Sequence, residues 1–432
     1  MLTPADIIAL LRADVAPSLG CTEPACAAIA AADAASRLTS EPVAIELAVS
    51  PQLFKNGRSV GIPRYAETGM DHAAALGALI ARPELGLEVF SAIDADVARK
   101  AQALAAATHV TIDPDHPGVY AAAEVTDADG HVARTVISGA HTRVIERAVD
   151  NAPLPPSDDG PDGAPLSAER HAQLAAEVVA LDLAGILALA ERCDVADLAF
   201  LADGIEMNEA VAARAAEGPS PVGIGQTLAD GAATGVFGKG LSDRIVLKVA
   251  SGIESRLDGA PCTVMSSAGA GSKGLAVVLP ITETAAEVGA TAEQTLRALA
   301  LGHLVNTWAN GRVGKLTAMC TCGMAASTAA ACGMAYLMGA DAEGIGRTVR
   351  TMCGTIAGMV CDGAKPSCGM KLAVASHAAV LAAAMGASGR VIRASDGIGA
   401  ETPEEAMGNV ARLAREGMAD ADAVMLDIMA NK

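Results

Sequence analysis

The segment Asn151–Ser167, NAPLPPSDDGPDGAPLS, divides this sequence into two parts of different character. It holds five proline and three aspartate residues within 17 positions. Proline fixes φ and lacks a backbone donor, so this density breaks both helices and sheet ladders. The segment is therefore predicted to be a surface linker or crossover that contains neither helix nor strand.

Residues 1–150, before this linker, mix two kinds of pattern. Helical spacing covers roughly 4–15, 23–38, 68–82 and 93–107. Strand-like runs fall at 43–49, 109–112, 119–126 and 131–138. The last two runs flank Asp127–Gly130, a turn-rich tetrapeptide that predicts a β-hairpin. Thr3 and Pro4 suit the N-cap and the first position of the first helix.

Residues 168–432, after the linker, are almost entirely helical in pattern. The sequence therefore predicts the α+β class, with an N-terminal mixed α/β portion followed by a predominantly α-helical C-terminal portion. The glycine-rich stretch before residue 282 is the main exception, because LAVVLP (275–280) resembles a short strand that ends at Pro280. The predicted helices are roughly 168–191, 194–216, 241–258, 282–309, 316–339, 341–358, 369–386 and, with breaks, 403–428.

The composition predicts a core of small side chains. Apolar residues make up 51% of the 432 residues, yet aromatic residues make up only 2%, and there are 44 glycines. Small side chains let helices approach closely. Residues 316–340 carry no charge and are long enough to span a membrane, but they are mostly Ala, Gly, Ser, Thr and Cys. A buried helix of a soluble protein is therefore predicted there, and likewise for 372–389.

The charge excludes several classes of partner. The formal net charge is −19, with no basic run, so neither nucleic acid nor an anionic membrane surface is an expected partner. The N-terminus lacks the basic-then-apolar order of a signal peptide, since Asp6 interrupts it early. A cytoplasmic protein with a small-molecule substrate is expected, and its small-residue helical surface would suit a homodimer.

Six of the ten cysteines fall within residues 320–368. In a cytoplasmic chain such a cluster indicates metal binding or catalysis rather than disulfides. Cysteine is also a small core residue, and this is the interpretation for four cysteines, whereas Cys262 is left unassigned. The four interpreted as core residues are Cys26, Cys193, Cys332 and Cys353.

Cys361 and Cys368 bracket CDGAKPSC, where glycine and proline place both thiols on or beside a loop. Cys320 and Cys322 precede them by about forty residues, and we expect only one of this pair to serve the same site. These spacings are not those of structural zinc. Thiolates from separated segments favour an iron–sulfur cluster, while another metal or no metal stays open.

Two further motifs carry chemistry. Cys21 is predicted at the N-terminus of a helix, where the exposed N–H groups would lower its pKa and make it a nucleophile, a base or a metal ligand. A buried turn cysteine is the alternative. Gly269–Gly274 matches GxGxxG, but no βαβ unit surrounds it, so it is not a dinucleotide site. Its backbone N–H groups and Lys273 could instead bind a substrate carboxylate.

Five segments together resemble the L-cysteine desulfidases, in that family's order and over most of the chain. They are GCTEP at 20–24, FKNGRSVGIP at 54–63, SSAGAGSKG at 266–274, GKLTAMCTCG at 314–323 and MVCDGAKPSCGMK at 359–371. The iron–sulfur L-serine dehydratases are more distant members of the same superfamily. The resemblance implies a [4Fe-4S] cluster, no pyridoxal phosphate, and conversion of L-cysteine to pyruvate, ammonia and hydrogen sulfide.

The resemblance also implies roles for individual residues. Cys361 and Cys368 match two cluster ligands, and Cys322 is preferred to Cys320 as the third because its separation from Cys361 is closer to the family's spacing. Cys21 matches the reactive cysteine of GCTEP. The substrate would be bound by the backbone and side chains of Gly271, Ser272 and Lys273.

Two departures from the family pattern concern the substrate. Thr321 stands where the family usually has glycine, and the loop at 271–273 lacks the family's asparagine. L-Serine dehydratase is therefore the alternative activity. A non-catalytic metal-binding helical protein, including a zinc-stabilised one, is the alternative from another class.

Overall fold

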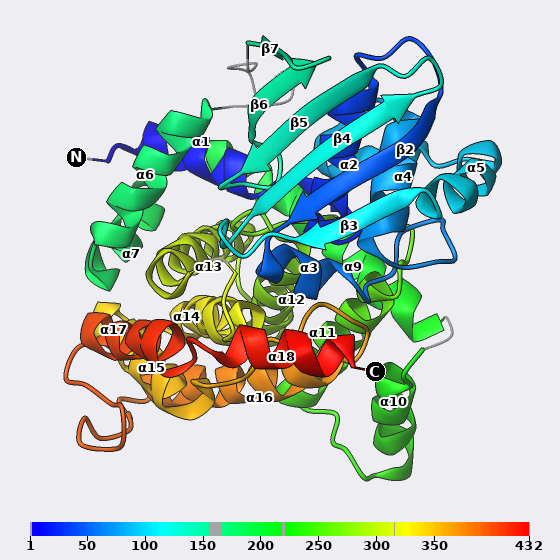
Figure 1. Cartoon of the computed structure of the whole chain (residues 1–432). Coiled ribbons are helices and arrows are strands. Elements are labelled where there is room, and N and C mark those ends of the chain that lie inside the picture. Colours follow the sequence, from blue (N-terminus) through cyan, green and yellow to red (C-terminus); the bar gives the residue numbers. More distant parts are fainter. Residues whose placement is uncertain (1, 156–165, 218–220, 315, 432) are drawn as a thin grey trace.

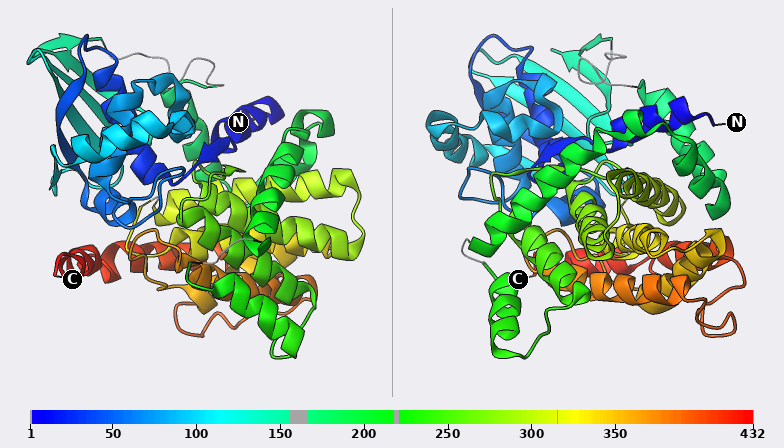
Figure 2. Two further views of the ribbon diagram at one scale, coloured as in Figure 1. Left: turned by 90° about the vertical axis from the view of Figure 1, so that its right-hand side faces the viewer. Right: turned by 180° about the vertical axis from the view of Figure 1, so that it is seen from behind.

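A computed structural model describes residues 2–155, 166–217, 221–314 and 316–431 of the chain. A β-sheet with helices on one face forms one part of the molecule, and a helical assembly lies beside it (Figures 1 and 2). The predicted α+β class is therefore confirmed.

Within the described residues the main sheet has six strands in the order β3-β2-β4-β5-β6-β7. Only the β2–β3 pair is parallel, and β4–β5 is the hairpin that the sequence predicts. The helices α2, α4 and α5 cover one face of the sheet (Figure 1). The strands are β2 (Pro42–Val49), β3 (Thr108–Ile112), β4 (Tyr120–Asp127), β5 (Val132–Ser138), β6 (Val144–Val149) and β7 (Ala152–Leu154).

The N-terminal helices begin where the sequence predicts. Thr3 caps α1 (Pro4–Asp14) by accepting from the backbone of Asp6, whose carboxylate returns the bond in a capping box. Between β2 and the hairpin the chain adds two short helical elements that the pattern did not predict. The remaining helices of this part are α2 (Thr22–Ala35), α3 (Pro51–Gly57), α4 (Met70–Ile80), η1 (Pro83–Ala92) and α5 (Ala95–Ala105).

The helical part is built around α14, which packs against α12, α13, α15 and α16. Its elements are α6 (Ala168–Ala180), α7 (Leu183–Arg192), α8 (Val195–Leu198), α9 (Leu201–Glu217), α10 (Ile224–Thr234), α11 (Leu241–Leu257), α12 (Gly271–Val288), α13 (Ala292–Val313), η2 (Cys322–Ala326), α14 (Ser327–Leu337), α15 (Ala342–Ile356), α16 (Cys368–Ala387), α17 (Pro403–Arg412), η3 (Leu413–Gly417) and α18 (Ala421–Ala430).

Two segments tie the halves together. Helix α1 packs against α6, α7 and α13, so its apolar side chains belong to the same core as the C-terminal helices. Strand β1 (Pro17–Leu19) pairs antiparallel with β8 (Thr263–Met265). The predicted boundary near residue 150 is thus crossed by the first twenty residues, although the division into portions itself stays a prediction.

Small residues bring helices into close contact, as the composition predicts. A Cβ at Gly77 of α4 would lie 2.0 Å from the carbonyl oxygen of Ala28 in α2. In the helical part, a Cβ at Gly333 of α14 would lie 2.4 Å from Ile281 of α12. Neither backbone could approach its neighbour so closely with a larger side chain.

Several sequence predictions of secondary structure and burial are wrong. The run 275–280 is not a strand, because α12 begins at Gly271 and continues through Pro280, which is buried on a helix flanked by apolar neighbours. The linker is not free of strand, because Ala152–Leu154 pairs with β6 as β7. Its residues 156–165 lie outside the described part of the chain. Helix α16 is buried on one face only, with Met370, Val374 and Leu381 exposed.

Helix α16, Cys368–Ala387, is long and apolar enough to cross a membrane by length and composition alone. No other helix in the described ranges meets this test. The core helix of a soluble protein passes it too, so the finding is weak evidence for a span.

Candidate functional site

Cys21 lies at the N-terminus of α2, as the sequence predicts, and is itself the N-cap, but its surroundings oppose a thiolate. Its Sγ donates to Glu23 Oε2 at 2.7 Å, and both side chains are buried. Burial raises the pKa of the Cys21 thiol well above its usual value, and the Glu23 carboxylate raises it further, whereas Arg256 works in the opposite direction. The predicted lowering of this pKa by the helix is therefore wrong, because burial dominates.

The glycine loop opens α12 and faces a buried arginine. Arg256 of α11 donates from Nη1 to Ser272 Oγ at 2.8 Å and from Nη2 to the carbonyl oxygen of Gly20. A Cβ at Gly271 would lie 2.4 Å from Arg256 Nη2, which explains this glycine without any dinucleotide. Lys273 is buried and donates to Asn310 Oδ1 of α13 at 2.5 Å. The loop thus contacts one buried cation through Ser272 and carries a second, Lys273.

The Cys320–Cys322 segment begins a π-helical turn, η2 (Cys322–Ala326). Cys320 precedes this turn, and its Sγ accepts from the backbone N–H of Gly323 at 3.4 Å. Single π-helical turns leave part of the backbone ladder out of register and are frequent at functional sites. The two thiols therefore lie on adjacent but differently shaped pieces of backbone, and the expectation that only one of them serves the site stays a prediction.

Cys361 lies in the loop after α15, and Cys368 is the first residue of α16, so both thiols are on or beside a loop as predicted. The loop and the CxC segment pair directly. The backbone N–H of Cys320 donates to the Met359 carbonyl, and that of Cys361 donates to the Ala318 carbonyl, each at 2.7 Å. This short antiparallel contact brings the two thiol-bearing segments together.

The thiols of these segments act on one another electrostatically. The hydrogen bond with Cys320 lowers the pKa of Cys361 despite burial, and the same bond raises that of Cys320. Burial raises the pKa of Cys322 to about 12, with Lys273 opposing and with Cys361 and Cys368 adding to the rise. All four candidate ligands are therefore neighbours.

Lysines surround the loop that carries Cys361. Lys371 and Lys365 both form ion pairs with Asp362, the residue that follows Cys361. Lys55 of α3 is 1% exposed and pairs with Asp422 of α18 at 2.5 Å, where these two helices lie side by side (Figure 1). Lys55 also contributes to lowering the Cys361 pKa. Thiolate charge is thus favoured at this loop.

The comparison with known families decides the relationship. The family described as serine dehydratase alpha chain matches residues 84–427. Proteins named UPF0597 protein match nearly the whole chain. The one from Oleidesulfovibrio alaskensis is 35% identical, covering 98% of this chain and 97% of its own. Those from Alkaliphilus oremlandii (33%, with 98% and 97% covered) and Porphyromonas gingivalis (31%, with 99% and 98% covered) are similar.

This chain belongs to the serine dehydratase alpha chain family. The resemblance described from the motifs is confirmed at that level. The matched range holds the glycine loop and all four candidate ligands, whereas Cys21 lies before it. The full-length similarity to the UPF0597 proteins covers Cys21 as well.

The cofactor that the family resemblance implies can be tested against this donor set. Among the described residues no three His, Cys, Asp or Glu side chains are close enough to hold a single metal ion. A [4Fe-4S] cluster makes a different demand, because each cysteine binds a different iron of a cube. Thiols that are neighbours without converging on one point fit a cluster, and the lysines around them suit its thiolate charge.

Four cysteines outside the site have the buried surroundings expected of core residues. Cys332 of α14 and Cys353 of α15 are 0% exposed, and burial raises the pKa of Cys353 to about 12. Cys26 and Cys193 are likewise buried. Cys262 lines a hollow of about 450 Å³ with Asp203 and Glu206, where nothing assigns it a function.

Four residues of this site were not predicted from the sequence: Glu23, Asn56, Lys55 and Arg256. Three of them lie inside motifs quoted for the resemblance, GCTEP and FKNGRSVGIP, which was the available signal. Arg256 lies outside every motif, in a helix whose pattern looks ordinary. Its 2% exposure, with Nε lacking a partner among the described residues, marks it only in the structure.

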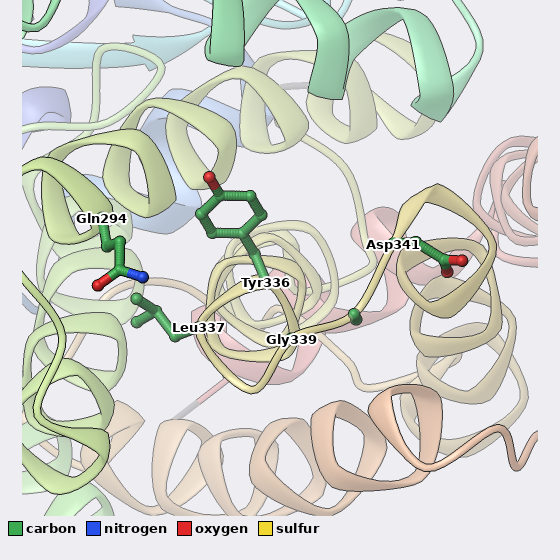
Figure 3. Close-up of a pocket in the computed structure, with 6 residues that line it drawn as sticks. Gln294, Tyr336, Leu337, Gly339 and Asp341 are labelled. Atoms are coloured by element: carbon green, nitrogen blue, oxygen red, sulfur yellow. The ribbon is translucent and has the colours of Figure 1, made fainter.

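A separate hollow of about 310 Å³ lies at the ends of α13 and α14 (Figure 3). Its lining includes Gln294, Tyr336 and Asp341, and it shares no residue with the thiol site. The Asp341 carboxylate is already engaged as the N-cap of α15, accepting from Gly344. This hollow therefore offers no chemistry comparable to that of the thiol site.

Proposed function

We propose that this protein is an iron–sulfur-dependent β-elimination lyase that converts L-cysteine to pyruvate, ammonia and hydrogen sulfide. The single observation that carries the proposal is the grouping of four thiols beside a fifth, Cys21, with buried cations between them. Membership of the serine dehydratase alpha chain family supports the reaction class.

Three thiols would hold the cluster: Cys322, Cys361 and Cys368. Three cysteines leave one iron of a [4Fe-4S] cluster open, and such an iron can act as a Lewis acid toward a leaving group or carboxylate. Cys320 remains the alternative third ligand, because its thiol is hydrogen-bonded to that of Cys361.

Cys21 is the proposed base for the α-proton of the substrate. Its thiol must first lose its own proton, and the buried Arg256 guanidinium is the charge that favours this loss. A positioned side chain that takes a proton in the transition state contributes about 10²–10⁴-fold to the rate.

The substrate carboxylate is proposed to bind between Ser272, Lys273 and Arg256, near the backbone of Gly271. Arg256 donates to the neutral oxygens of Ser272 and Gly20, and it also interacts with the Cys21 thiol. A buried guanidinium with neutral partners suits an incoming anion, which it can bind with two parallel hydrogen bonds. Fixing the carboxylate would orient the α-proton toward Cys21.

L-Serine is the second candidate substrate, and the family's description favours it. Elimination would then release water in place of sulfide, through the same aminoacrylate, which hydrolyses to pyruvate and ammonia. The changed loop at residues 271–273 lies at the position proposed for substrate binding, so it bears on this choice.

The test is pyruvate formation by anaerobically reconstituted full-length protein, with L-cysteine and L-serine offered side by side. We expect turnover of L-cysteine that is lost on exposure to air. Preference for L-serine would keep the reaction and change the substrate, while zinc in place of iron, with no pyruvate, would favour the non-catalytic helical protein.

A cytoplasmic location and a homodimer remain proposals, testable by fractionation and by sedimentation.

A further inference from the structure

One buried carboxylate connects the thiol of Cys21 to the rest of the site. Glu23 lies in the first turn of α2 and is 8% exposed. Its Oε2 accepts from Cys21 Sγ at 2.7 Å and from Thr22 Oγ1 at 3.1 Å. Its Oε1 accepts from Asn56 Nδ2 at 3.3 Å. Both carboxylate oxygens are therefore held, which fixes the direction of the carboxylate.

Asn56 extends this connection to the loop that carries the candidate ligands. It lies near the end of α3 and is 6% exposed. A carboxylate can only accept, so the Asn56 amide must turn its NH₂ group toward Glu23. Its Oδ1 then lies 3.8 Å from Cys361 Sγ. The side chains of Cys21, Glu23, Asn56 and Cys361 thus form one continuous chain across three segments.

Charged groups from other elements face the same carboxylate. Burial works to raise the pKa of Glu23, but His141, between β5 and β6, and the bond from Cys21 outweigh it, so the pKa stays below its usual value. Arg256 of α11 interacts electrostatically with both Glu23 and Cys21. The Glu23 carboxylate also raises the pKa of Cys322 of η2. The negative charge of the Glu23 carboxylate is therefore stabilised by His141 and by Arg256.

We propose that Glu23 is the positioning residue for Cys21: its carboxylate directs the Cys21 sulfur and restrains the loss of the thiol proton, and Asn56 holds that carboxylate in register with the Cys361 loop. This inference rests on the proposed function, because it assumes that Cys21 is the base. It assigns Glu23 an electrostatic role that a residue serving only to cap the helix would not have.

The first test is the pH dependence of Cys21 alkylation by iodoacetamide, followed by mass spectrometry on the anaerobically reconstituted full-length chain. All variants carry Cys26→Ala, so that Cys21 is the one thiol in α2. Since only the thiolate reacts, removal of the neighbouring negative charge in Glu23→Gln should lower the midpoint by about one pH unit. An unchanged midpoint in a folded variant would overturn the proposal.

The second test separates positioning from folding. Glu23→Ala removes the acceptor that directs the Cys21 sulfur, so it should lower kcat roughly tenfold or more with KM near its original value, and Glu23→Asp should recover part of the loss. Asn56→Ala leaves the carboxylate in place, so it should keep the alkylation midpoint but lower kcat. Should Glu23→Gln not fold, unaltered kcat in Asn56→Ala would still contradict the proposal.

The two proposals can fail independently. If reconstituted protein makes no pyruvate, the proposed function fails, yet the alkylation comparison still reports whether Glu23 governs the Cys21 thiol. If pyruvate forms and the midpoint does not move, the lyase assignment stands and Glu23 is structural.

Discussion

The cysteines of this protein occupy two contrasting environments. Cys332 and Cys353 lie inside helices α14 and α15, fully buried among apolar side chains. Cys361 is half-buried on a loop, where it is hydrogen-bonded to Cys320 and acted on by Lys55 and Lys371. Burial raises the pKa of Cys353, whereas the pKa of Cys361 is lowered.

The comparison teaches that burial alone does not decide what a thiol can do. A buried cysteine without charged neighbours behaves as a small apolar residue. A buried cysteine beside donors and cations can carry the negative charge that metal ligation requires. Loop or helix placement predicted this difference from sequence, and the following predictions test it, beginning with the largest expected effect.

The largest effect is expected on metal content. Cys361→Ala should remove most of the iron and the visible absorption of the reconstituted protein, because it deletes a proposed ligand. Cys353→Ala is the matched control and should keep both. Iron and acid-labile sulfide assays would measure the difference, and equal iron in the two variants would refute the ligand role of Cys361.

The next effect is on turnover without loss of metal. Cys21→Ser should keep the cluster but lower the rate of pyruvate formation by about 10²-fold or more, because a hydroxyl is a far weaker acid than a thiol. Cys26→Ala, five residues along the same helix, should leave the rate almost unchanged. A Cys21→Ser protein with full activity would show that the base lies elsewhere.

The helical interior should also disfavour charge on a histidine. His303 of α13 bonds Ser267 Oγ at 2.8 Å, and burial lowers its pKa to about 4. The unfolded chain gains this proton near pH 6.5, so stability is full above that pH and falls as the pH drops toward 4. The loss should reach about 3 kcal/mol, at about 1.4 kcal/mol per pKa unit.

Denaturant unfolding of His303→Gln at several pH values would check this. The variant should lack the part of the pH dependence that lies between about pH 6.5 and 4. An identical pH profile in both proteins would mean that folding does not shift the pKa of His303, and the contrast between interior and thiol site would be weakened.

The smallest effect concerns the interior cysteines. Cys332→Ser places a hydroxyl among apolar helices and should cost about 1–3 kcal/mol of unfolding free energy. Iron content should not change. Cys332→Ala is the control for volume. Loss of iron from either variant while it remains folded would contradict a purely structural role for Cys332.

Much of the fold could be predicted because its signals are local. The Thr3 N-cap followed by Pro4 and the turn at 127–130 each act within a few residues, and both are confirmed. Pro280 misled the prediction, because a proline usually ends a helix but is tolerated where the flanking turns are buried. Strand β7 was not predicted, because a strand of three residues with a proline at its centre gives no alternating pattern.

The site was predictable only in part for the same reason. Cys361, Cys368 and Cys21 stand beside helix breakers or helix starts, which the sequence displays. The contact of Asn56 with Cys361 joins residues 305 positions apart, and that of Arg256 with Gly20 joins residues 236 apart. No local pattern encodes such pairs, so the charges that govern the thiols appear only in the fold.

The most direct test of the central claim is Mössbauer spectroscopy of the anaerobically reconstituted protein, with and without L-cysteine. We expect a [4Fe-4S] cluster with about four irons per chain, and one iron whose signal shifts when the amino acid binds. Iron without a cluster, or a cluster whose four irons all ignore L-cysteine and L-serine, would contradict it.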